Sequence, residues 1–118
     1  MTLKARHVDD VVILDFAGRL TLGEPTFLLR QLIRELLGSG YRKFIFNLGE
    51  VHYIDSAGLG ELVACFTSVR KCEGVICLLN LTQRARGLLQ MTKLLTVFDT
   101  YTDEAVALEK LKSTPSAP

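Results

Sequence analysis

Hydrophobic and polar positions follow two different periods along this chain, and the two periods predict alternating strands and helices. Short runs of β-branched, aromatic and leucine residues predict strands over residues 3–8, 11–17, 43–48, 75–81 and 97–100. Apolar residues spaced by three and four predict helices with starts at Pro25, at or just after Ser56, after the cap residue Thr82, and at Thr102. The predicted order is therefore β-β-α-β-α-β-α-β-α.

Each predicted helix has one apolar face that we expect to point into the core. These faces are Leu28, Leu29, Leu32, Ile33, Leu36 and Leu37 in the first helix, Leu59, Leu62, Val63, Phe66 and Val69 in the second, Ala85, Leu88, Leu89 and Thr92 in the third, and Ala105, Leu108 and Leu111 in the last. Gly18 is predicted to end the second strand, and residues 38–40 to end the first helix. Residues 49–55 are predicted to form a loop.

This order of elements predicts an α/β domain with a mixed sheet. The polar turn Asp9-Asp10 joins the first two strands as an antiparallel pair, and the longer connections call for parallel strands joined by right-handed crossovers. If neighbours in the chain are neighbours in the sheet, all the crossover helices lie on one face. We expect one domain over residues 1–112 and a disordered tail over residues 113–118.

Composition narrows the range of functions. The 118 residues include 14 Lys and Arg against 13 Asp and Glu, so the chain lacks the basic excess of a nucleic-acid-binding protein. No segment predicts a secretion signal or a membrane span, so we expect a cytoplasmic protein. Cys65, Cys72 and Cys77 are interpreted as reduced thiols and His7 and His52 as surface residues, because their spacing suits no metal site. We expect no metal and no cofactor.

The segment from Tyr53 to Gly60 is the strongest candidate for a functional site. It places Ser56 beside Asp55 at a helix start and puts two glycines in the first turn, where each costs the helix about 0.5–1 kcal/mol relative to alanine. The glycines would let the backbone of another molecule approach the Ser56 hydroxyl. Alternatively, Asp55 or Ser56 only caps the helix and the glycines allow close packing on the sheet. The residues alone leave both readings open.

Enzymatic readings of this segment are weaker. His52, Asp55 and Ser56 are the residue types of a hydrolytic triad, but residues so close along one loop rarely reach the required geometry. Ile54 replaces the first glycine of the G-x-S-x-G elbow, and Val63 replaces the third glycine of a dinucleotide fingerprint. No phosphate-binding loop of the G-x-x-x-x-G-K-[ST] type is present. We therefore expect no catalytic activity.

Residues 54–60, Ile-Asp-Ser-Ala-Gly-Leu-Gly, closely resemble the phosphorylation-site motif of STAS domains, a family named for sulphate transporters and anti-sigma factor antagonists. Residues 18–20, 47–48 and 79–82 also resemble landmarks of that family, and the resemblance runs from about Leu3 to Leu111. Members of this length are usually stand-alone bacterial anti-sigma factor antagonists. The resemblance thus implies a STAS-like domain with such a role.

The resemblance implies that Ser56 is phosphorylated by a partner that is both a serine kinase and an anti-sigma factor. The unphosphorylated form would bind this partner and free the sigma factor for transcription, the phosphorylated form would release it, and a phosphoserine phosphatase would restore the first state. Oligomeric state is not implied. The residues implied to contact the partner are Thr21, Gly23, Asp55, Ala57, Gly58, Leu59 and Gly60.

One position departs from the family pattern. Many antagonists carry an acidic residue after the Gly-x-Leu landmark, where this chain has Thr21. Thr21 is compatible with altered kinase pairing, with a second hydroxyl near the site, with a member that binds partners without phosphorylation, or with a solvent-facing turn residue. The rival function is accordingly that of a non-phosphorylated STAS scaffold, or of an accessory subunit in a signalling or transport assembly.

Overall fold

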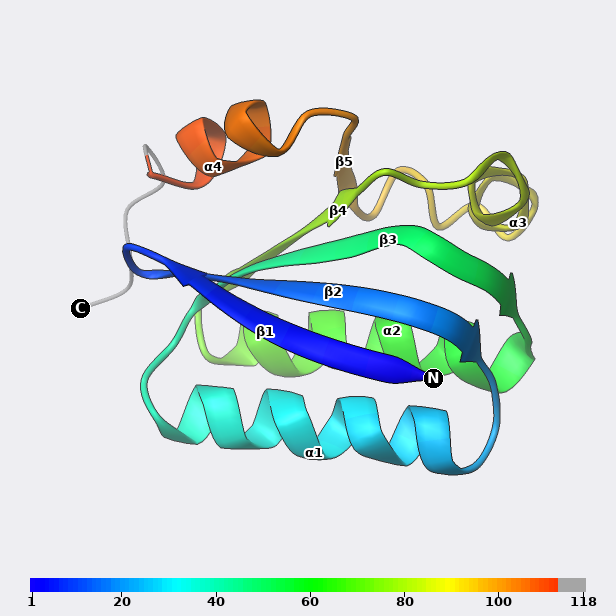
Figure 1. Cartoon of the computed structure of the whole chain (residues 1–118), viewed down its shortest axis with the longest axis horizontal. Helices are drawn as coiled ribbons and strands as arrows, with labels where there is room; N and C mark the ends of the chain where they lie inside the picture. Colours follow the sequence, from blue (N-terminus) through cyan, green and yellow to red (C-terminus); the bar gives the residue numbers. More distant parts are fainter. Residues whose placement is uncertain (113–118) are drawn as a thin grey trace.

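The computed structural model describes residues 1–112 and contains one mixed sheet with strand order β1-β2-β3-β4-β5 (Figure 1). Its strands are β1 (Thr2–Val8), β2 (Val11–Leu20), β3 (Lys43–Ile54), β4 (Val75–Leu79) and β5 (Asp99–Tyr101). Its helices are α1 (Glu24–Gly38), α2 (Ser56–Lys71), α3 (Gln83–Met91) and α4 (Glu104–Lys112). β1 and β2 are antiparallel and the remaining pairs are parallel, so the predicted fold is confirmed. The predicted disordered tail, 113–118, lies outside the described residues.

The two faces of the sheet are covered by different helices (Figure 1). α1 and α2 lie on one face, where their apolar side chains form the main core with Phe16, Phe44 and Phe46. Leu89 of α3 belongs to the same core, but α3 lies beside the end of β3 and not under the sheet with α1 and α2 (Figure 1). The expected placement of the crossover helices on one face therefore holds for α1 and α2. α4 lies on the opposite face, where Ala107 and other apolar side chains of the helix cover a second, smaller cluster. No helix of the described residues is both long and apolar enough to cross a membrane.

β2 and β3 are longer than the sequence predicted. β2 continues past Gly18 to Leu20, and β3 continues through the predicted loop at residues 49–55 as far as Ile54. The two extensions pair with each other, from Ala17 opposite Glu50 to Leu20 opposite Ile54. The pairing shifts register twice, between Asp15 and Ala17 and between Gly18 and Arg19, and at each shift β3 has one residue more than β2. Gly18 adopts a φ of 110°, which glycine tolerates best. These extensions carry both strands to the start of α2.

The predicted inner faces of α1 and α4 each include a residue that is exposed in the structure. In α1 the buried side chains include Leu29, Ile33 and Leu36, whereas Leu28 is 37% exposed, so its predicted place in the core is wrong. In α4 the buried residues are Ala107 and Leu111, and the predicted inner residue Ala105 is exposed. In both helices an apolar residue beside the true stripe was included in the predicted face. α4 has only nine residues, so its sequence offers few positions to distinguish the two.

Strand and helix ends also differ in detail. β4 ends at Leu79 although the apolar run continues to Leu81, and the last strand begins at Asp99 and not at residue 97. Phe98, just before β5, is buried in the main core. The predicted cap is confirmed, since the Thr82 hydroxyl accepts a hydrogen bond from the Ala85 amide at 3.1 Å.

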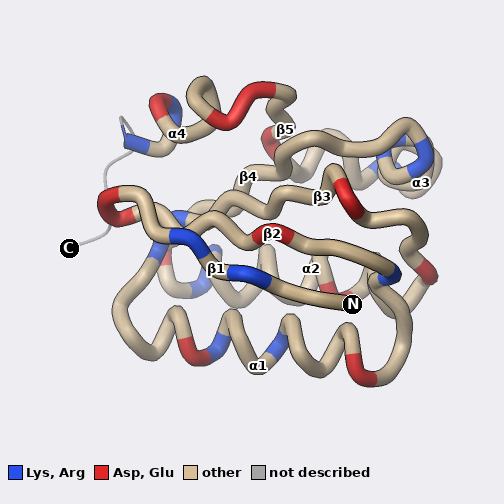
Figure 2. The backbone as a smooth tube through the Cα atoms, viewed as in Figure 1, with Lys and Arg blue, Asp and Glu red and all other residues tan. Residues whose placement is uncertain are grey.

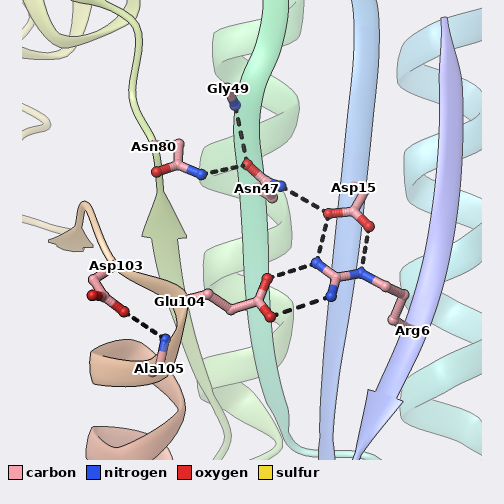
Figure 3. Close-up of polar contacts among 8 residues, drawn as sticks. All are labelled: Arg6, Asp15, Asn47, Gly49, Asn80, Asp103, Glu104 and Ala105. Carbon is pink, nitrogen blue, oxygen red and sulfur yellow. Dashed lines mark hydrogen bonds and ion pairs between the residues drawn. The ribbon is translucent and has the colours of Figure 1, made fainter.

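A polar network crosses the face of the sheet that α4 covers (Figure 3). Arg6 of β1 donates to both carboxylate oxygens of Asp15 on β2, at 2.6 and 3.0 Å, and to Glu104 of α4 at 2.7 Å. Asn47 of β3 donates to Asp15 at 2.8 Å, and Asn80 donates to Asn47 at 3.2 Å. The Arg6 and Asn47 hydrogen bonds, with the nearby charges, hold the pKa of Asp15 below its usual range. The network joins the first strand to the last helix.

Candidate functional site

Asp55 links the two loops that border the start of α2. It lies between β3 and α2, and its carboxylate accepts a hydrogen bond from the Gly58 amide at 2.7 Å, which caps the helix. The second carboxylate oxygen accepts from the Leu22 amide at 3.0 Å, in the loop between β2 and α1. These backbone donors, Leu22 first, lower the pKa of Asp55. The Asp55 carboxylate thus fixes the β2–α1 loop against the N-terminus of α2.

Ser56 is the first residue of α2, so the predicted helix start is confirmed. Its side chain is exposed. Its hydroxyl makes no hydrogen bond to any residue from 1 to 112. Ala57 and Leu59 beside it are half-buried. The arrangement presents a free hydroxyl at a helix N-terminus, where backbone N–H groups and the helix dipole favour an added negative charge.

The two glycines of the first turn have different environments. A Cβ on Gly58 would collide with the carbonyl oxygen of Leu20, because α2 crosses directly over the end of β2. A Cβ on Gly60 would meet nothing within 4 Å. Close packing therefore explains Gly58, as the second reading of the motif supposed, and it does not explain Gly60. Gly60 leaves an open surface one turn after Ser56.

The β2–α1 loop contributes Thr21, Leu22 and Gly23 beside this surface. Thr21 is half-buried, so it is not a purely solvent-facing turn residue. Gly23 has a φ of 108° and precedes α1, where its carbonyl accepts a hydrogen bond from the Thr26 hydroxyl at 3.0 Å. Leu22 is 77% exposed although its amide is held by Asp55. We call Thr21, Leu22, Gly23 and residues 55–60 the Ser56 surface.

Sequence reasoning missed the exposed apolar side chains of Leu22 and Phe27, and it named Tyr53 only as the start of the candidate segment. Tyr53 at the end of β3 is 39% exposed, and the guanidinium of Arg19 lies over its ring at 4.9 Å from the centroid. Phe27 in the first turns of α1 is 58% exposed. The available signal was a leucine placed in a polar turn, since an exposed large apolar side chain in a turn is unexplained by the core.

Glu61 joins α2 to α1 through an ion pair next to the Ser56 surface. Its side chain is 4% exposed and accepts hydrogen bonds from Arg30 of α1 at 2.7 and 3.2 Å. The pair joins α1 to α2 one residue after Gly60. Glu61 was not included in the predicted inner face of α2, because a carboxylate is rarely buried unless it is paired.

The residues of a hydrolytic triad do not come together. Both carboxylate oxygens of Asp55 accept backbone hydrogen bonds, and within residues 1–112 no hydrogen bond joins His52 to Asp55 or Ser56. His52 is exposed on β3 and lines a pocket beside α3 that Ser56 does not line. In the same range, no group of three or more His, Cys, Asp or Glu residues is arranged to hold a metal ion.

Known proteins share the sequence pattern and the fold of this chain. The family model of the STAS domain matches residues 2–107, nearly the whole described chain. The chain belongs to the STAS domain family. A relative from Thermotoga neapolitana, named "Putative anti-sigma factor antagonist TM1081 homolog", is 30% identical over 105 residues, which are 89% of this chain and 93% of the relative.

Solved STAS structures share the fold. The crystal structure of the Thermotoga maritima protein TM1081 is 27% identical, with a TM-score of 0.86 over 93% of this chain and 94% of that one. Unphosphorylated SpoIIAA, an anti-sigma factor antagonist, has a TM-score of 0.76 at 18% identity, over 96% of this chain and 100% of its own. Phosphorylated SpoIIAA from Bacillus has a TM-score of 0.74 at 21% identity, over 92% and 98% of the two chains. The STAS fold thus accommodates both states of SpoIIAA.

Proposed function

We propose that this STAS domain is a cytoplasmic anti-sigma factor antagonist that works by partner switching, with Ser56 as the phosphoacceptor. Its partner would be an anti-sigma factor with serine kinase activity, and a phosphoserine phosphatase would reverse the modification. The observation that carries the proposal is the free Ser56 hydroxyl at the start of a fixed helix, next to an open turn at Gly60. The names of the relatives support the same class of function.

The geometry suggests how a phosphate would act. It would add about −1.5 to −2 charge beside the Asp55 carboxylate, on a surface that presents exposed apolar groups such as Leu22. A partner surface that fits a neutral hydroxyl would then meet like-charge repulsion and a desolvation cost. The domain itself would stay folded, because the N-terminus of α2 favours added negative charge. The switch would therefore act on binding and not on the fold.

The proposal treats the domain as a substrate of its partner and not as an enzyme. Asp55, the only acidic group of the Ser56 surface, is held by two backbone amides and is not placed to take a proton from Ser56. Thr21 takes the position where many antagonists have an acidic residue. Its half-buried place in the loop held by Asp55 favours a contact role over that of a free turn residue.

Phosphorylation and binding can be tested with the purified partner. The Ser56→Ala variant, which cannot be modified, would capture the anti-sigma kinase from cell extract, and the recovered kinase would be expressed and purified. We expect that kinase with ATP to add one phosphate to the wild type, located at Ser56 by mass spectrometry, and none to Ser56→Ala. Modification at another residue, or none, would exclude Ser56 as the acceptor.

Calorimetric titration then measures the effect of charge. We expect Ser56→Asp to bind the partner at least about tenfold more weakly than the wild type, with an unchanged fold. Ser68→Asp is the matched control, because Ser68 is an exposed serine on the same helix and lies outside the Ser56 surface. Equal affinity of Ser56→Asp and the wild type would reject the charge switch.

A further inference from the structure

A pocket of about 310 Å³ lies between the C-terminal part of β3 and α3. Residues 51–54 of β3 form one wall, and the start of α3 forms the other with Thr82, Arg84, Ala85 and Leu88. This volume falls within the range of small-molecule sites in proteins. Neither Ser56 nor any loop residue of the Ser56 surface lines the pocket, so it is a different site.

The sheet topology explains why this space exists. β4 pairs with β3 only as far as Leu79 opposite Asn47, and the rest of β3 has β2 as its sheet neighbour. α3 lies beside the extended end of β3, where another strand would otherwise continue the sheet (Figure 1). A helix packs farther from a strand edge than a paired strand does, since adjacent strands are only about 4.8 Å apart. The gap between β3 and α3 is therefore a consequence of the fold.

The lining combines apolar side chains with one positively charged side chain, that of Arg84. Val51 and Ala85 are buried, and Ile54 and Leu88 are half-buried. No acidic residue lines the pocket, whereas the exposed Arg84 does. Within residues 1–112, Arg84 has no ion-pair partner, and α3 carries basic but no acidic residues (Figure 2). An apolar cavity with an uncompensated guanidinium is suited to an apolar molecule that bears a negative group.

We propose that this pocket binds a small organic acid with an apolar body, whose carboxylate pairs with Arg84. The body would fill the space between Val51 and Leu88. The guanidinium can donate two parallel hydrogen bonds to a carboxylate, which gives the site its preference for an acid over a neutral analogue. The proposal does not rest on the function proposed for Ser56, because the two sites share no charged group.

The test uses indole-3-acetate as the probe and indole-3-acetamide as its neutral match. The full chain is titrated with each probe and binding is monitored by the chemical shifts of the amide NMR signals. We expect indole-3-acetate to shift the signals of residues 51–54 and of the first turns of α3. We expect the acetate to bind the wild type at least about tenfold more tightly than the acetamide. Shifts confined to other parts of the molecule, no shifts at millimolar probe, or equal binding of acid and amide would overturn the proposal.

Two variants of α3 separate the carboxylate contact from general positive charge. Arg84→Gln is expected to abolish the preference for the acid while leaving the acetamide affinity unchanged. Arg86→Gln removes the same charge from a residue that does not line the pocket, and it is expected to retain the preference. Leu88→Phe, which narrows the cavity, is expected to weaken both probes. An equal loss of preference in Arg84→Gln and Arg86→Gln would overturn the Arg84 contact.

Discussion

Arg30 and Glu61 form an ion pair in which the two partners have very different exposures. The Glu61 side chain is 4% exposed, whereas that of Arg30 is 54% exposed, and their closest atoms are 2.7 Å apart. Removal of one partner is therefore not equivalent to removal of the other. A carboxylate left unpaired inside the protein costs its full desolvation, whereas an exposed guanidinium left unpaired is solvated by water.

We predict that Arg30→Met lowers the stability of the domain more than Glu61→Gln does. Glutamine at position 61 keeps a hydrogen-bond acceptor for Arg30, whereas methionine at position 30 leaves the buried Glu61 carboxylate without its Arg30 hydrogen bonds. Urea unfolding gives the free energy of unfolding of each variant and shows which of the two has lost more stability. Arg34→Met is the matched control, since Arg34 is an exposed arginine of the same helix without an ion pair in the described residues. A larger loss in Glu61→Gln would refute the explanation.

The glycines of the α2 start are predicted to respond in opposite directions. Gly58→Ala brings a methyl group against the Leu20 carbonyl, and overpacking of this kind costs about 1–3 kcal/mol or more. Gly60→Ala adds a methyl group in open space and removes the glycine penalty, so it raises the free energy of unfolding by about 0.5–1 kcal/mol. Chemical denaturation of the two variants is the measurement. A neutral Gly58→Ala would show that α2 can move away from β2 at little cost.

Asp55 is predicted to give the domain part of its sensitivity to acid. Because the Leu22 and Gly58 amides lower the pKa of Asp55 in the folded state, its contribution to stability is complete above its unfolded pKa of about 3.8. This contribution is lost as the pH falls through the lowered folded value. Asp55→Asn should therefore melt below the wild type at pH 7, and the gap should shrink below about pH 4. A gap that stays constant between pH 7 and pH 3 would contradict this linkage.

The cysteines are predicted to differ in reactivity. Burial, with a smaller contribution from Glu61, raises the pKa of Cys65 to about 12, and burial raises that of Cys77 to about 11. Cys72 is only half-buried. A thiol reagent at pH 8 should modify Cys72 first, and the other two should react only after the domain unfolds. Cys72→Ser should remove the fast phase, and a fast phase that persists in this variant would disprove the assignment.

Sequence patterns could predict the parts of the fold that depend on residues close together in the chain. Short apolar runs place the central strands, and the helix start at Ser56 and the cap at Thr82 follow from residues within one turn. The extension of β3 to Ile54 was missed because exposed polar residues interrupt its apolar run. Its strand conformation depends on pairing with the end of β2, which the segment itself does not encode.

In the candidate site, too, features of contiguous residues could be predicted and contacts between distant residues could not. The motif around Ser56 was recognisable because its residues are contiguous. The bond from Leu22 to Asp55 joins positions 33 apart in the chain, and no periodic pattern indicates such a contact. The roles of Gly58 and Gly60 became distinguishable only when the Leu20 carbonyl was placed in space. The buried Glu61 depends likewise on Arg30, which lies on another helix.

The contact between Arg6 and Glu104 joins residues 98 apart in the chain, which constrains the order of folding during synthesis. Each strand pairs with the strand made before it, so the sheet can grow as the chain leaves the ribosome. The apolar surface of Val11, Ile13 and Ile45 is then complete well before α4 exists to cover it. A nascent chain halted before residue 104 would display this surface to solvent, and chaperones or other nascent chains could bind it. Docking of α4 is thus the step that ends the exposure.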